Sequence, residues 1–254
     1  MAKHLKLSNN HEDYLNFKET SDFILPNVSY CVQENEVHYN DKFMGHAYVD
    51  LGLPSGTLWA TMNIGATDEW DVGDAYVWGE TEVRDIVENM SRSPDLYYDA
   101  NKWIISSEPN NANAAHYFTK YCSDSTKGYE GFVDNKKRLD LEDDAAHVNW
   151  GGEWHMPTSY QIKELLDNTT WEGGSFDGYG IFTSKINGKQ IIFPGVINYR
   201  LCLSCDLNES NDWLCWSLNP YYDDFYADDW SGRGFNLPVR PVIGEEIVIQ
   251  EEES

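Results

Sequence analysis

The sequence predicts an α+β domain in which short strands and two helices support long loops. Three observations lead to this expectation. Short apolar stretches alternate with glycine and proline turns, as strands do. Two segments carry helix start and stop signals. Residues 81–135 are polar and irregular, which is typical of long surface loops.

The composition limits the class of protein. A chain of 254 residues can bury a core without disulfide or metal staples, and its 14% aromatic residues argue against disorder. Its 18 Lys and Arg residues stand against 43 Asp and Glu residues, so the net charge is −25. The resulting field repels phosphate backbones and anionic lipid heads. We therefore expect no nucleic-acid partner.

The cysteines and the N-terminal stretch bear on the compartment. The cysteines are odd in number and widely spaced, which predicts free thiols rather than a disulfide framework; they are Cys31, Cys122, Cys202, Cys205 and Cys215. The start, MAKHLKLSNNHEDYLNFKE, lacks the apolar run of a signal peptide, and no later window reaches the length of a membrane span. We expect synthesis in the cytoplasm, no membrane insertion and release by another route, such as lysis that frees a virus particle.

Residues 1–45 are predicted to form an attachment or docking segment. HEDYLNFKE has a helix-like pattern, and Pro26 in the stretch Ile24–Asn27 stops any helix. VSYCVQENEVHYN alternates enough to predict strand pairing. The segment is too short for a core of its own.

Residues 46–243 are predicted to form the main domain. YVDLGLPSGTLWATMNIGA predicts two short strands interrupted by a turn at Pro54-Ser55-Gly56, and VGDAYVWGE predicts another strand that ends at Gly79. LEDDAAHVNW predicts a helix with acids in its first turn, which ends at Gly151-Gly152.

A second helix and a hairpin follow. In MPTSYQIKELLDN, Thr158 or Ser159 can cap the helix, and the apolar face that should pack on a sheet consists of Ile162, Leu165 and Leu166. GYGIFTSK and KQIIFPGV predict a hairpin with Asn187-Gly188 as a two-residue turn. NLPVRPVI predicts one last strand before an acidic tail, residues 244–254.

Residues 198–235 are the candidate binding surface. Nine of these 38 residues are aromatic, and Tyr and Trp supply large contact areas with few rotatable bonds. Seven acids against two arginines favour a ligand with exposed Lys or Arg, or a polyhydroxylated ligand stacked on the rings. We expect a protein or glycan receptor on a cell surface. The predicted contact residues are Asn198, Tyr199, Leu201, Leu203, Ser204, Asp206, Asn211, Asp212, Leu214, Tyr221, Tyr222, Asp224, Tyr226, Asp228, Arg233 and Phe235.

Four ordered motifs resemble a known family: YVDLGLPSGTLWAT, YVWGET, LEDDAAHVNWGGEWHMPTSYQIKELL and LPVRPV, spread over residues 48–242. They are similar to the C-type-lectin-like domains of bacteria and phages, in particular the Fibrobacter succinogenes major paralogous domains, which share the fold of formylglycine-generating enzymes. The resemblance implies a small mixed sheet and two helices below ligand-binding loops. Over a shorter length, the N-terminal segment resembles phage and prophage tail-tip or fibre proteins. That likeness implies a virion-associated protein, with a trimer as one possible state.

The resemblance also implies diversification. Many such domains are variable proteins of diversity-generating retroelements, in which template adenines are copied to random bases before a motif like Val239-Arg240-Pro241-Val242. Randomised Asn codons never yield Lys, Gln, Glu, Met or Trp. Residues 198–235 contain no Lys, Gln or Met and a single Glu, Glu209. We expect Trp213, Trp216 and Trp230 to be fixed between variable positions, although an aromatic, loop-rich segment can also lose Lys and Met by chance.

Three motifs have other functional interpretations. Cys202-x-x-Cys205 could bind a metal or act in redox chemistry, but no second pair or nearby His completes a zinc site. Glu108-Pro109-Asn110 spells a calcium-dependent sugar motif, but it lies upstream of the predicted helices. Glu142–Asp144 could bind a cation, whereas their place in the first turn of a helix explains them fully.

The remaining motifs are interpreted as structural. His147 and His155 flank the packing motif Trp150–Trp154, and Arg240 is expected to be buried against a carboxylate. We therefore predict no catalytic residues, no metal site, no cofactor and no enzymatic activity. The alternatives are an enzyme of the formylglycine-generating class, a calcium-dependent lectin, or a structural decoration domain.

Overall fold

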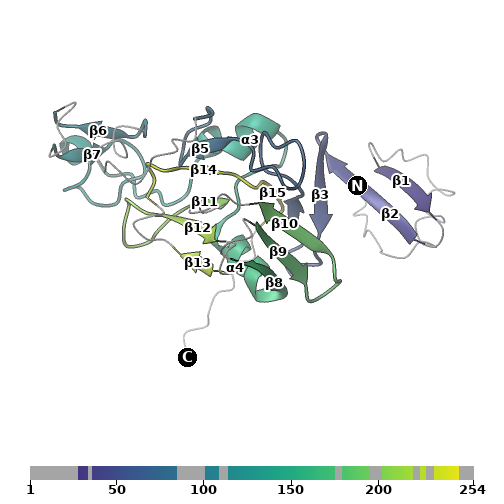
Figure 1. Ribbon diagram of the computed structural model, residues 1–254. Helices are drawn as coiled ribbons and strands as arrows, with labels where there is room; N and C mark the ends of the chain where they lie inside the picture. The colour runs from purple at the N-terminus through teal and green to yellow at the C-terminus, as the bar shows by residue number, and fades with distance from the viewer. Residues whose placement is uncertain are drawn as a thin grey trace, which may run out of the picture. The chain divides into compact units, whose positions relative to one another are not determined.

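The computed structural model describes residues 28–33, 36–84, 101–108, 114–174, 179–194, 202–219, 224–226 and 232–245. The chain divides into two compact units, Met1–Lys42 and Phe43–Ser254. The described part is a mixed α+β protein, mostly strands in small open sheets with two α-helices (Figure 1). The predicted α+β class is confirmed. Within the described ranges, no helix is long and apolar enough to cross a membrane.

The strand pairing predicted near the N-terminus is confirmed. β1 (Val28–Gln33) and β2 (Glu36–Phe43) are antiparallel, with Val28 opposite Asp41 and Gln33 opposite Glu36. The predicted helix in HEDYLNFKE and the Ile24–Asn27 break lie outside the described residues.

Strands β3 (His46–Asp50) and β4 (Leu58–Ala60) are the two strands predicted around the proline turn. They pair antiparallel, and the Gly56 N–H donates to the Leu53 carbonyl at 2.8 Å within the turn. The other edge of β4 pairs with β15 (Val242–Ile243).

The last strand of the prediction is in fact two strands. β14 (Asn236–Pro238) pairs with β5 (Ala75–Val77), whereas β15 pairs with β4. The chain changes sheets at Val239–Pro241. Pro241 has no N–H to donate to a ladder, and its carbonyl accepts from the Ala60 N–H at 2.9 Å. The single-strand prediction is therefore wrong.

Both predicted helices form. The 3-10 turn η2 (Leu141–Asp143) precedes α3 (Ala145–Trp150). Asp144 caps α3 by accepting from the His147 N–H at 2.9 Å. The helix ends at Gly151, whose φ of 73° is a conformation that glycine adopts without strain.

Helix α4 (Ser159–Asn168) begins at a capping box. The Thr158 side chain accepts from the Gln161 N–H, and the Gln161 side chain accepts from the Thr158 N–H. The predicted apolar face is confirmed, because Ile162 and Leu165 are fully buried and Leu166 packs against the same core cluster.

The predicted hairpin after α4 forms, but with a longer turn. The three-stranded sheet has the order β10-β9-β8, and its strands are β8 (Thr169–Gly174), β9 (Tyr179–Ser184) and β10 (Gln190–Pro194). The connection spans residues 185–189 because Ser184 Oγ accepts from the N–H groups of Ile186 (3.0 Å) and Asn187 (3.2 Å). The two-residue turn is therefore wrong.

The stretch predicted as long loops is partly ordered structure. β6 (Ile104–Ser106) and β7 (His116–Phe118) form an antiparallel hairpin at one end of the second unit, followed by the 3-10 turn η1 (Tyr129–Gly131) (Figure 1). Phe118 and Tyr121 are fully buried. Their burial corrects the expectation that residues 81–135 lie on the surface.

Two main core clusters lie within the second unit. One packs Trp78, Tyr121 and Leu139 with Leu203 and Leu237. The other packs Trp59, Phe182 and Phe193 with Ile162 of α4 and with Leu218 of β12 (Cys215–Asn219). Because Leu203 and Leu218 lie in the predicted binding stretch, that stretch contributes to both cores.

Candidate ligand-binding surface

The predicted binding stretch contributes a three-stranded antiparallel sheet. β11 (Cys202–Leu207), β12 (Cys215–Asn219) and β13 (Asp224–Tyr226) pair in that order, beside α4 (Figure 1). Leu203 lies opposite Ser217, but Leu207 lies opposite Cys215. β11 therefore bulges between these pairs, and a bulge redirects the side chains within it.

Ser204 and Asp206 of β11 are buried and bonded to other parts of the fold. The Ser204 carbonyl accepts from Trp78 Nε1 at 3.0 Å. The Asp206 carboxylate accepts from Arg138 Nε at 2.6 Å and from the N–H and Oγ of Ser159, both at 2.8 Å. Because Ser159 is the first residue of α4, Asp206 joins β11 to the start of the helix.

Asp212 holds the connection between β11 and β12. Its side chain is 1% exposed, and it accepts from Lys137 Nζ at 2.5 Å and from the Ser123 N–H at 2.8 Å. Burial on its own raises the pKa of Asp212, but the hydrogen bonds from Lys137 and Ser123 outweigh it and the pKa is lowered. Asp212 is therefore a charged anchor inside the protein.

Arg233 is a second anchor and is fully buried. Its Nη1 donates to the Tyr121 carbonyl at 3.0 Å and its Nη2 to the Lys120 carbonyl at 3.1 Å. The guanidinium lies over the Phe118 and Trp78 rings, 4.5 and 5.0 Å from their centroids. Burial lowers the pKa of Arg233 to about 10, so the group stays charged at neutral pH.

The structure divides the predicted contact residues into four sets. Six are buried: Leu203, Ser204, Asp206, Asp212, Arg233 and Phe235. Two are partly exposed: Asn211 and Leu214. Two are described as strand backbone alone: Asp224 and Tyr226. Six lie outside the described residues: Asn198, Tyr199, Leu201, Tyr221, Tyr222 and Asp228. For the buried set, a framework role replaces the predicted ligand contact, because these side chains are enclosed by the core or by hydrogen-bond partners.

The exposed part of the described stretch is the turn between β11 and β12. Glu209 and Ser210 are exposed. Asn208 Oδ1 accepts from the Ser210 N–H at 3.0 Å, and Asn211 Oδ1 accepts from the Trp213 N–H at 3.1 Å. The contact prediction left out residues 208–210, although Asn and Ser between two apolar runs already indicate a surface turn.

The tryptophans predicted to be fixed are partly described. The Trp213 ring packs on Phe118, with centroids 4.2 Å apart and planes tilted by 49°. Trp216 is half-buried, and Trp230 lies outside the described residues. Trp213 therefore fastens one end of the exposed turn to the core cluster of Ile104, Phe118 and Cys122.

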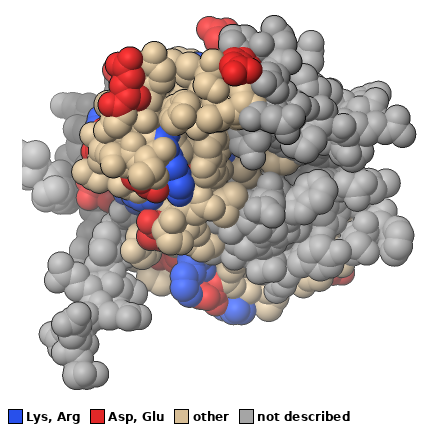
Figure 2. Space-filling view, turned by 90° about the vertical axis from the view of Figure 1, so that its left-hand side faces the viewer, with Lys and Arg blue, Asp and Glu red and all other residues tan. Residues whose placement is uncertain are grey.

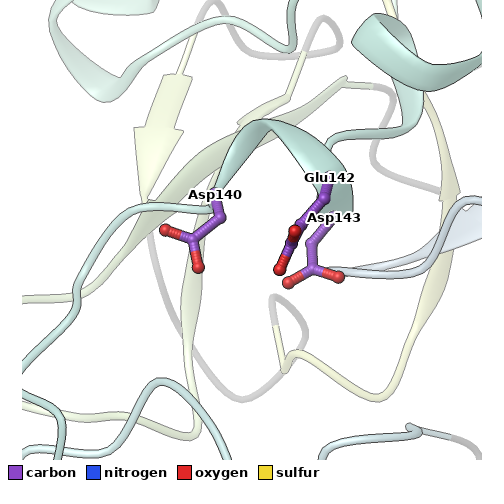
Figure 3. Close-up of side chains that lie close together, drawn as sticks. All are labelled: Asp140, Glu142 and Asp143. Atoms are coloured by element: carbon purple, nitrogen blue, oxygen red, sulfur yellow. The ribbon is translucent and has the colours of Figure 1, made fainter.

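Among the described residues, one group of acids could hold a metal ion: Asp140, Glu142 and Asp143, whose carboxylate oxygens lie within 4.8 Å of one another at the η2 turn (Figure 3). The Lys120 ammonium lies among them, 2.8, 3.3 and 2.6 Å from these three carboxylates in turn. Burial on its own lowers the pKa of Lys120, but the hydrogen bonds to Asp140 and Asp143 outweigh it and the pKa is raised.

The structure thus refines the interpretation of the Glu142–Asp144 run. Asp144 caps α3, as an acid at the start of a helix should, whereas Glu142 and Asp143 pair with Lys120. The cation among these acids is the ammonium group of Lys120.

Replacing Lys120 with methionine is expected to lower the free energy of unfolding by about 1 to 2 kcal/mol, because the buried Asp143 loses one of its donors. Millimolar Ca²⁺ should restore part of that loss, since the three carboxylates regain a cation. Melting temperatures with and without Ca²⁺ test this. Lys127→Met, which removes an exposed pair with Asp124, is the control; equal Ca²⁺ effects in both variants and the parent would contradict the expectation.

The described cysteines are poorly placed for chemistry. Cys122, Cys205 and Cys215 are buried. Burial raises the pKa of the Cys122 thiol, and it raises the pKa of Cys215 to about 12. Since the thiolate is the reactive form, neither Cys122 nor Cys215 is set up as a nucleophile.

The motifs interpreted as structural have structural contacts. His155 Nε2 lies 3.0 Å from the Gly244 carbonyl, and His147 Nδ1 lies 3.3 Å from the Trp154 carbonyl. Arg240 is buried as predicted, and its Nε donates to the amide oxygen of Asn63 at 2.7 Å. These contacts confirm the structural interpretation of the histidines.

On the face shown in Figure 2, the basic side chains of described residues lie beside acidic ones and form no broad basic patch. Comparison with known proteins found no matching family model, no similar curated protein and no similar solved structure.

Proposed function

We propose that this chain is a ligand-binding protein that recognises a cell-surface receptor through its C-terminal stretch, residues 198–235. In this proposal the second unit has a C-type-lectin-like fold, the stretch is diversified by a retroelement, and the protein belongs to the tail of a phage or prophage. The observation that carries the proposal is the separation of buried anchors from exposed positions within one short stretch. Asp206, Asp212 and Arg233 are buried in the fold, whereas Glu209 and Ser210 are exposed.

This separation suits a surface that must bind many different ligands. Rigid anchors keep the ends of a turn in place, so a ligand pays little ordering entropy when it binds. Exposed residues between the anchors can then change without loss of the core. The composition of the stretch, rich in Tyr and Trp and devoid of Lys, Gln and Met, agrees with such a surface.

The proposal sharpens which positions vary. Asp, Ser, Leu, Phe and Arg are permitted products of randomised Asn codons, so composition alone places both buried and exposed residues in the variable set. Because they are buried, we assign four of these residues to the constant set instead: Leu203, Asp206, Asp212 and Arg233. In this proposal these residues are constant, and variation concentrates at permitted residues that are exposed or partly exposed, such as Asn208, Ser210 and Asn211.

The proposal is of a binder and not of an enzyme. Cys122 and Cys215 have raised pKa values, so neither of these two thiols is suited to act as a nucleophile. The acid group at η2 already surrounds Lys120, which argues against a calcium-dependent lectin site there.

The test combines genomic sequence with binding. We expect a reverse-transcriptase gene and a template repeat near this coding sequence, with differences mainly at template adenines and with constant codons at the buried anchors. The absence of both a template repeat and a reverse-transcriptase gene would rule out the proposed diversification.

In a pull-down on host cells, the double variant Tyr221→Ala/Tyr222→Ala should bind at least about tenfold more weakly than the parent.

The matched control for the binding test is Tyr160→Ala. Tyr160 is 50% exposed on α4, outside the candidate stretch, so its loss should leave binding unchanged. Equal binding by the parent, the double variant and Tyr160→Ala would rule out a receptor-binding role for this stretch, whatever the genomic result.

A further inference from the structure

An exposed tryptophan lies outside the C-terminal stretch. Trp70, between β4 and β5, is 55% exposed, although large apolar side chains gain most from burial. Its ring meets the Tyr179 ring at the start of β9 edge to face, with centroids 5.2 Å apart and planes at 90°. The two rings, here called the Trp70–Tyr179 corner, leave aromatic surface open to solvent.

The loop that presents Trp70 is held by its own carboxylates. Asp68 Oδ1 accepts from the Trp70 N–H at 2.8 Å. Asp71 accepts from the N–H and Oγ1 of Thr67 at 2.9 and 3.0 Å, and from the Gly73 N–H at 3.1 Å. At Gly73, with φ of 72°, an added Cβ would overlap the Ile64 carbonyl oxygen, so only glycine fits. The corner is therefore presented with little freedom to lose on binding.

The charge around the corner has one sign along the loop. Residues 66–74, ATDEWDVGD, contain the acids Asp68, Glu69, Asp71 and Asp74 and no Lys or Arg. Asp68 and Glu69 are exposed. The hydrogen bonds from Thr67 and Gly73 lower the pKa of Asp71, so this carboxyl is charged at neutral pH.

Aromatic faces and carboxylates together select a cation. A guanidinium or ammonium group over the face of Trp is attracted by the ring quadrupole, and nearby carboxylates concentrate cations at the surface. A neutral saccharide gains stacking on the ring but nothing from the charges. The loop chemistry thus favours a basic side chain over an uncharged ligand.

We propose that the Trp70–Tyr179 corner is a second binding site, which takes the guanidinium of an arginine side chain on a partner protein. This site lies outside residues 198–235 in the sequence, and the proposal does not depend on the function proposed for them.

The test uses the full chain and a soluble peptide of alternating glycine and arginine, with N-acetylarginine amide as the single-residue probe. We expect both probes to shift the Trp70 indole N–H resonance, which is assigned by its disappearance in Trp70→Phe. Calorimetry should show that Trp70→Ala binds the peptide at least about threefold more weakly than the parent. Peptide binding by the parent should also weaken as salt is added. Tyr160→Ala, with another exposed aromatic residue removed, should bind like the parent.

Two results would overturn the proposal. Unchanged peptide binding by Trp70→Ala, in a variant whose melting temperature matches the parent, would mean that the peptide is attracted by net charge alone. A methyl glucoside that shifts the Trp70 resonance as much as N-acetylarginine amide would make the corner a saccharide platform instead.

Discussion

Replacing Arg240 with methionine should lower the free energy of unfolding by about 3 to 5 kcal/mol, enough to unfold a marginally stable domain. Arg240 is fully buried. Its guanidinium donates to Asn63 Oδ1 at 2.7 Å, to the carbonyls of Ala60 and Thr61 at 3.1 and 3.0 Å, and to the Ile192 carbonyl at 2.9 Å. Methionine fills part of the space but donates nothing, so buried acceptors are left unsatisfied. Denaturant unfolding measures the loss.

Two further variants test the cause of this loss. Arg240→Lys keeps the charge but replaces a planar fork with a single ammonium, so it should recover only part of the stability. Lys163→Met removes an ion pair whose two side chains are 63% and 62% exposed, and it should change the stability by less than about 0.5 kcal/mol. A loss in Arg240→Met no larger than that in Lys163→Met would show that the buried fork contributes nothing.

Replacing Asp212 with asparagine is expected to cost about 2 to 3 kcal/mol at pH 7, because the charge-assisted bond to Lys137 is lost in a buried place. The pKa of Asp212 is lowered in the folded protein, because the bonds from Lys137 and Ser123 outweigh its burial. Its contribution is therefore fully present above the unfolded pKa of about 3.9 and is lost as the pH falls through the folded pKa.

The pH dependence is the decisive readout. Between about pH 5 and pH 2 the parent should lose stability more steeply than Asp212→Asn, so the two unfolding free energies converge in acid. Asp140 and Asp143 also have lowered pKa values, so both proteins still weaken in acid. Asp167→Asn, at an exposed position, is the control and should follow the parent. Parallel curves for the parent and Asp212→Asn would refute the role given to Asp212.

The elements that could be predicted from the sequence are those with local causes. The Thr158–Gln161 capping box, the β3–β4 turn at Gly56 and the alternation of β9 each depend on residues within a few positions. The turn at 185–189 was mispredicted because the Ser184 hydroxyl, rather than the Asn187-Gly188 pair, sets its width. Side-chain hydrogen bonds of this kind leave little trace in a hydrophobic pattern.

The polar framework of the candidate surface could not be predicted in the same way. Asp206 and Asp212 find their partners 68 and 75 positions earlier in the chain, in Arg138 and Lys137. Acidic and basic residues are rarely buried unless they are paired. When the partners are not known, the sequence of the stretch alone therefore predicts that Asp206 and Asp212 lie on the surface. Composition located the stretch, but only the tertiary partners separate anchors from exposed positions.

The change of sheets at Val239–Pro241 makes two sheets of the second unit depend on strands that follow the candidate stretch. β14 and β15 follow the candidate stretch and complete sheets begun by β5 and β4, far earlier in the chain. A reading frame lost within residues 198–235 supplies neither strand and no Arg240, so two strand edges stay open. Both sheets therefore close only when residues 198–235 are followed in frame by β14 and β15.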